Sequence, residues 1–125
     1  ISSLARAQAV LLTKVDLVEQ TTVEQIRQTI ARVTSIPVYE SRHAFSQLRR
    51  GRAIESVELL RGQRVAAFCA IGNPDAFRTM LERAGATVVN FDAFADHRAL
   101  SADDLQALDR RAEKLGVDRL ITTAK

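Results

Sequence analysis

An apolar run over residues 65–71, closed by Gly72-Asn73-Pro74, constrains the fold more than any other feature of the sequence. A continuous apolar run of this length, bounded by turn residues, is typical of a strand that is buried on both faces of a parallel sheet. Asn73 is a favourable N-cap, and Pro74 suits the first helical turn because its missing N–H has no role there. The segment therefore predicts a buried strand that leads directly into a helix.

The residues that follow predict a strand–helix–strand unit. Phe77, Leu81 and Ala84 fall on one helical face, and Gly85 stands where a left-handed residue commonly ends a helix. Residues 87–91 then form a second apolar strand. Strands joined in this way by a helix are parallel, and ligands of such sheets gather beyond the carboxyl ends of the strands.

The rest of the chain continues this alternation of helices and strands. Thr21-x-x-Glu24 and Ser101-x-x-Asp104 both match the capping box that opens a helix. Short strands are expected at residues 9–12, 36–39 and 119–123, and a short helix at residues 53–60. The predicted fold class is α/β, an α/β/α sandwich with a mostly parallel sheet.

Positive charge is concentrated in one part of the sequence. The formal net charge is +3, and all but three of the 18 cationic side chains are arginine. Six arginines lie within residues 42–64: Arg42, Arg49, Arg50, Arg52, Arg61 and Arg64. Guanidinium groups bind phosphate as planar forks, so the cluster suits an anionic ligand or an anionic lipid surface, with a solvated connector as the alternative. Aromatic residues make up 5% and do not alternate with basic ones, so no nucleic-acid partner is expected.

Motifs that bind triphosphates or metals are incomplete in this chain. No glycine is followed by lysine, so the phosphate-binding loop Gly-x-x-x-x-Gly-Lys-Ser/Thr is absent. Thr13-Lys14-Val15-Asp16 resembles the guanine-reading motif of GTP-binding proteins, but a polar strand exit is the commoner source of such a tetrapeptide. No metal site is expected, because the two histidines are His43 and His97 and the single Cys69 lies inside a predicted strand. No apolar run approaches the ~20 residues of a membrane span.

Asp96-His97 is the candidate acid–base pair. It follows the second predicted strand of the central unit, at the end of the sheet where ligands are expected. A histidine in such a loop can orient a catalytic carboxylate or help to take a proton from a hydroxyl group. The alternative is a loop histidine that only bonds to backbone.

Five segments, in order, resemble the tetraacyldisaccharide 4′-kinases, which act in lipid A biosynthesis. They are Thr13-Lys14-Val15-Asp16, Phe68-Cys69-Ala70-Ile71-Gly72-Asn73-Pro74, Gly85-Ala86-x-Val88-Val89, Phe94-x-Asp96-His97-x-x-x-Ser101-x-x-Asp104-Leu105 and Thr122-Thr123-x-Lys125. The resemblance covers nearly the whole chain and corresponds to the C-terminal half of the family. It implies that residues 1–40 end a nucleotide-binding α/β domain, 41–63 are an Arg-rich linker, and 64–125 are a C-terminal α/β domain.

The resemblance also implies a function. Members of the family are P-loop NTPase-like kinases that move the γ-phosphate of ATP, with Mg²⁺, onto the 4′-hydroxyl of an acylated disaccharide 1-phosphate. An N-terminal half that this chain lacks would hold most of the ATP and Mg²⁺, so the chain alone is expected to be inactive. The family works peripherally at the cytoplasmic face of the bacterial inner membrane, whose anionic surface would be a partner. The alternative is a non-catalytic α/β binding or interaction module derived from this fold.

The resemblance assigns candidate residues. Asp96 and His97 are the catalytic candidates, and His97 would pair with a catalytic Asp of the other half. The candidates for contact with substrate or phosphate are Asn73, Arg98 and Lys125. Two positions depart from the family pattern, because Arg98 replaces a common second His and Ala124 replaces the Glu of Thr-Thr-Glu-Lys. Both departures bear on activity.

Overall fold

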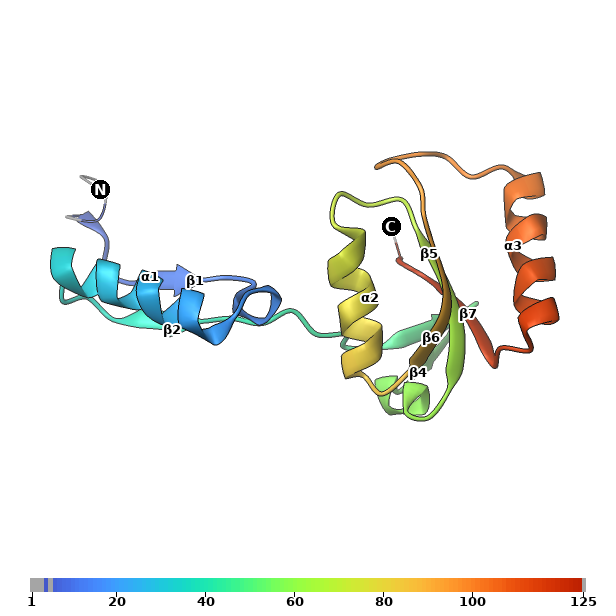
Figure 1. Cartoon of the computed structure of the whole chain (residues 1–125), viewed down its shortest axis with the longest axis horizontal. Coiled ribbons are helices and arrows are strands. Elements are labelled where there is room, and N and C mark those ends of the chain that lie inside the picture. Colours follow the sequence, from blue (N-terminus) through green and yellow to red (C-terminus); the bar gives the residue numbers. More distant parts are fainter. Residues whose placement is uncertain (1–3, 5, 125) are drawn as a thin grey trace. The chain divides into compact units, whose positions relative to one another are not determined.

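The computed structural model describes Leu4 and residues 6–124 and divides the chain into two compact units (Figure 1). Unit 1 is Ile1–Ala44 and unit 2 is Phe45–Lys125. The boundary lies inside the Arg-rich segment, so most of that segment belongs to unit 2. Helices alternate with strands that are mostly parallel, which confirms the predicted α/β class.

A three-stranded parallel sheet forms the centre of unit 2. Strand β5 (Arg64–Cys69) lies between β6 (Thr87–Ala93) and β7 (Arg119–Thr122) and pairs in parallel with both. Every residue of β5 except the first is buried, as predicted for a strand covered on both faces. The strand–helix–strand prediction for residues 65–91 is therefore confirmed.

Two helices cover opposite faces of this sheet, so unit 2 has three layers (Figure 1). Helix α2 (Pro74–Arg83) lies on one face and helix α3 (Ala102–Leu115) on the other. Successive side chains of a strand point to opposite faces, so alternate residues of β5 serve the two layers. The core on the α2 side comprises Leu60, Val65, Ala67, Cys69, Phe77, Leu81 and Ala86. On α3, Leu108 and Ala112 are the buried residues.

Polar contacts fasten α3 to the sheet. The Arg111 guanidinium lies 2.8 Å from the Asp92 carboxylate on β6. At the C-terminus of the helix, about one turn beyond Arg111, the Arg64 guanidinium donates to the carbonyls of Leu115 and Gly116, both at 3.3 Å. A cation at this position satisfies the last helical carbonyls and interacts favourably with the helix dipole.

The starts of the helices in unit 2 match the sequence predictions. Asn73 caps α2, because its side-chain oxygen accepts from the Ala76 N–H at 3.1 Å. Ser101 and Asp104 form the predicted capping box of α3. Local side-chain chemistry therefore sets both helix starts, as expected for capping residues.

Unit 1 pairs β1 (Val10–Leu12) with β2 (Val38–Glu40) in parallel, with the short helix η2 (Val15–Leu17) and helix α1 (Gln20–Val33) between them in sequence. The capping box predicted at Thr21 is wrong. Helix α1 begins at Gln20, its N-cap is Glu19, and no side chain caps it. Thr21 already lies inside the helix, where its hydroxyl is 3.5 Å from the Glu19 carboxylate.

The helix predicted over residues 53–60 is also wrong in its first half. Strands β3 (Leu48–Arg50) and β4 (Ala53–Glu55) form an antiparallel hairpin that turns at Gly51. Only η3 (Val57–Leu60) is helical, as a 3₁₀ turn. Cross-strand pairing makes residues 53–55 a strand rather than a helix, and a local sequence pattern does not reveal such pairing.

We predict that Gly85→Ala destabilises the protein by about 2 kcal/mol or more, against about 1 kcal/mol for Gly116→Ala. Both glycines have left-handed φ angles, +93° and +61°, but only Gly85 is crowded: a Cβ there would lie 3.1 Å from the Cα of Arg61. At Gly116 a Cβ would meet nothing within 4 Å. Urea unfolding of both variants measures the difference. Equal losses would contradict the steric argument.

Candidate functional site

The loop after β6 is tied to the end of β5. Phe94 donates its N–H to the Cys69 carbonyl at 2.8 Å, and His97 donates its N–H to the Ala70 carbonyl at 3.1 Å. These bonds continue the pairing of the two strands beyond their carboxyl ends. Residues 94–98 therefore lie beside the turn that connects β5 to α2, at the edge where parallel sheets bind their ligands.

Asp96 lies against this turn. A Cβ placed on Gly72 would be 3.4 Å from the Asp96 carboxylate oxygen Oδ2. The carboxylate therefore lies within van der Waals reach of Gly72, next to the start of α2. Carboxylates are favourable near a helix N-terminus because the first N–H groups carry partial positive charge.

The imidazole of His97 is largely exposed to solvent. Its backbone is left-handed, with φ of +60°, and 77% of its side chain is exposed. The Nε2 atom lies 3.8 Å from Oδ1 of Asp96, close enough for an ion pair if the ring is protonated but too long for a hydrogen bond. The backbone of His97 is fixed by its bond to Ala70, while the ring can reach a group outside the loop.

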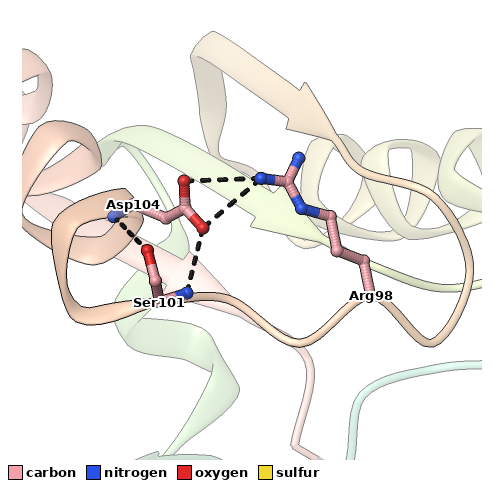
Figure 2. Close-up of polar contacts among 3 residues, drawn as sticks. All are labelled: Arg98, Ser101 and Asp104. Carbon is pink, nitrogen blue, oxygen red and sulfur yellow. Dashed lines mark hydrogen bonds and ion pairs between the residues drawn. The ribbon is translucent and has the colours of Figure 1, made fainter.

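Arg98 connects this loop to helix α3 (Figure 2). Its Nη2 atom lies 3.4 Å from each carboxylate oxygen of Asp104, and its guanidinium carbon lies 4.9 Å from the centre of the Phe94 ring. The backbone N–H of Arg98 donates to the Ala95 carbonyl at 3.0 Å. Arg98 therefore contacts both the loop and the helix that follows it.

Asp104 is the acceptor that organises these contacts (Figure 2). Its carboxylate accepts from the Ser101 N–H at 2.9 Å, and the Ser101 hydroxyl accepts from the Asp104 N–H at 3.1 Å. The bond from the Ser101 backbone is the main reason that the pKa of Asp104 is lowered, with smaller contributions from the Ser101 hydroxyl and the Arg98 guanidinium. Hydrogen bonds to the charged form favour that form.

The remaining candidates lie in different surroundings. The side-chain oxygen of Asn73 is used to cap α2, and Asn73 directly follows Gly72, the residue that Asp96 approaches from the loop after β6. Lys125 lies outside the described residues. Lys14, from the tetrapeptide at residues 13–16, has a left-handed backbone and belongs to unit 1. Across Leu4 and residues 6–124, no group of three or more His, Cys, Asp or Glu side chains could hold a metal ion.

Sequence reasoning placed Asp96 and His97 in the loop after the second strand but missed two contacts of this loop. The approach of Asp96 to Gly72 joins residues on two different loops. Arg98 and Phe94, which stack, are only four residues apart in the sequence. Because they lie in an irregular loop without a regular repeat, this spacing did not predict the contact.

Unit 2 thus has the architecture of an α/β protein, with a polar loop beyond the carboxyl ends of its parallel strands, which is where such proteins commonly bind ligands. The chain matches the Tetraacyldisaccharide-1-P 4′-kinase family over residues 1–125 and belongs to this family. No solved structure matches the chain. No helix within the described part is long and apolar enough to cross a membrane.

Similar proteins include several named Tetraacyldisaccharide 4′-kinase. The one from Anaeromyxobacter sp. (strain K) is 36% identical over 99% of this chain and 33% of its own length. The Syntrophus aciditrophicus (strain SB) protein is 35% identical over 73% of the chain and 25% of its own length. The Rhodopseudomonas palustris (strain TIE-1) protein is 46% identical over 56% of the chain and 20% of its own length. The chain thus spans at most about a third of these relatives.

We predict that Asp104→Asn lowers stability at pH 7 and that its gap from the wild type closes in acid. The pKa of Asp104 is lowered from 3.8, so its charged form stabilises the fold above that value, and the contribution is lost as pH falls through the lower folded pKa. Chemical unfolding of the wild type and the variant, repeated from pH 7 to pH 2, measures the difference in stability at each pH.

Asp103→Asn is the matched control for this prediction. Asp103 lies in the same helical turn, and among the described residues its carboxylate has no hydrogen bond or ion pair. If Asp103→Asn lowered stability at pH 7 as much as Asp104→Asn does, negative charge anywhere in the first turn of α3, rather than the contacts with Ser101 and Arg98, would be responsible.

Proposed function

We propose that this chain is the C-terminal part of a lipid A biosynthesis kinase that transfers the γ-phosphate of ATP to the 4′-hydroxyl of tetraacyldisaccharide 1-phosphate. The observation that carries the proposal is the position of Asp96-His97. In a chain that matches the family throughout, the pair lies beyond the carboxyl ends of two adjacent parallel strands. Its loop is fixed to the end of β5 by backbone bonds.

The proposed role of the site is positioning and proton handling. Phosphoryl transfer depends mostly on alignment and charge stabilisation, so a histidine on a second domain can contribute by orienting a carboxylate or accepting a proton. The exposed His97 ring suits a group that acts on a partner surface, and Asp96 at 3.8 Å can stabilise the ring when it is protonated. Asn73 follows β5 and Arg98 follows β6, both beyond the carboxyl ends of the strands, and they are proposed candidates for contact with phosphate. Lys125 is a third candidate.

The proposal assigns ATP and Mg²⁺ mainly to residues outside this chain. No glycine here is followed by lysine, so the backbone cradle that holds a triphosphate in P-loop enzymes is missing. The parallel pair of β1 and β2, joined through α1, has the pattern of a strand–helix–strand unit from a P-loop NTPase-like sheet. We assign unit 1 to the end of that nucleotide-binding domain on this basis.

The proposed location is the cytoplasmic face of the bacterial inner membrane, with peripheral attachment. The substrate is acylated and lies in a membrane, so the enzyme has to work at a lipid surface. The arginines within residues 42–64 support this location because basic segments are attracted to anionic leaflets.

A second candidate function is a non-catalytic α/β binding module. Two departures favour it: Arg98 is engaged with Asp104 where a second His is common, and Ala124 has no carboxylate where Glu is common. A Gly-rich loop ending in Gly-Lys-Ser/Thr, encoded upstream in the same gene, favours the kinase. Its absence favours the module.

We predict that His97→Ala lowers 4′-kinase activity of the whole gene product by ~100-fold or more, because an acid–base or orienting group is lost. The assay follows phosphate transfer from MgATP to the disaccharide 1-phosphate. His97→Asn should have the same effect while tolerating the left-handed backbone at this position.

His43→Ala is the control for the His97 variants, because His43 is the other histidine and is exposed. We expect it to retain wild-type activity. Full activity in both His97 variants would reduce His97 to a loop residue, and no activity in folded wild-type protein would favour the binding module.

We further predict that the 125-residue chain alone transfers no phosphate from MgATP to the substrate. The reason is the missing phosphate-binding loop. Activity of the purified chain above that of a buffer blank would overturn the assignment of ATP to residues outside it.

A further inference from the structure

The hairpin formed by β3 and β4 carries an exposed basic tip. We define the hairpin tip as Arg49, Arg50, Arg52 and Ile54, which surround the turn at Gly51. All four side chains belong to exposed residues. Within Leu4 and residues 6–124, none of the three guanidinium groups has a hydrogen bond or ion pair.

The base of the hairpin, in contrast, contacts the core and the sheet of unit 2. Glu55 Oε2 lies 2.8 Å from Arg119 Nη1 on β7, and Leu48 packs against the core. Just before the hairpin, the Phe45 ring lies edge-on to Phe77, with centroids 5.9 Å apart. The tip is therefore held on a fixed support. The nearest carboxylate along β4, Glu55, is already neutralised by Arg119.

An apolar side chain accompanies the charge. Ile54 is 64% exposed, and the hairpin register pairs it directly with Arg49. Residues paired across a hairpin share one face, so Ile54 lies next to the aliphatic stem of Arg49. An apolar side chain beside long cationic ones is the arrangement of interfacial surfaces, where apolar groups reach the acyl boundary and guanidinium groups bind lipid phosphates.

We propose that the hairpin tip docks on the surface of an anionic phospholipid bilayer, with Arg49 and Arg52 on lipid phosphates and Ile54 at the acyl boundary. The inference rests on the proposed function for its setting and deepens it by naming the element that contacts the membrane. Charge complementarity favours this occupant, because the three arginines are exposed and none of them has a carboxylate partner among the described residues. Single-stranded nucleic acid would need aromatic side chains for stacking, and the tip has none.

The test uses the whole gene product and sedimentation with phosphatidylcholine vesicles, with or without phosphatidylglycerol. Arg49→Gln/Arg52→Gln should weaken binding to the anionic vesicles by about 25-fold, since each basic residue near such a surface contributes about fivefold. Binding to pure phosphatidylcholine should stay unchanged. Ile54→Ser should weaken binding to both kinds of vesicle by a few fold.

Arg78→Gln/Arg110→Gln is the matched control, because it removes the same charge from exposed helix positions of unit 2. It should change anionic binding by less than threefold. An equal loss in the control would show that overall charge, rather than the tip, is responsible. Unchanged binding of the tip variant would also overturn the proposal.

Kinase activity in detergent micelles separates this inference from the proposed function. There the tip variant should transfer phosphate at the wild-type rate, since no bilayer is involved. Tip-dependent vesicle binding by an inactive protein would uphold the inference and reject the kinase. Normal vesicle binding with reduced micellar activity would place the tip on the substrate and overturn the inference.

Discussion

Backbone pairing of the buried strand β5 supports both the core and the candidate site. Its N–H and C=O groups lie away from water, so each requires a partner, and β6 and β7 supply them on either side. Beyond the strand, the carbonyls of Cys69 and Ala70 accept from Phe94 and His97. The hydrogen bonding that satisfies the buried strand therefore continues beyond it and also fixes the loop that carries Asp96 and His97.

The far end of this loop is fixed by different chemistry. Ser101 and Asp104 close the first turn of α3, and Arg98 bridges from the loop to the Asp104 carboxylate (Figure 2). The loop thus runs between a backbone attachment at β5 and a charged attachment at α3. Short connections held at both ends lose little further entropy on binding, which suits a residue that has to be pre-positioned.

The family match and the particular side chains of this chain carry different information. Membership follows from similarity along all 125 residues, whereas the chemistry depends on a few positions. At Arg98 this chain uses a cation to stabilise the loop, and at Ala124 it has no ionisable group. The arginines of the hairpin tip lie on another element of unit 2 and have no partner among the described residues, so they are available for a role separate from the Asp96-His97 loop.

The sequence alone determined the features that depend on neighbours a few residues apart. The buried strand, the helix starts at Asn73 and Ser101, and the placement of Asp96-His97 after a strand all follow from local patterns, because caps and periodicity act within about four residues. Only the tertiary structure decided the β6-β5-β7 order, the hairpin in place of a helix at residues 53–55, and the approach of Asp96 to Gly72. These depend on pairing between distant segments, whose energy a local pattern does not contain.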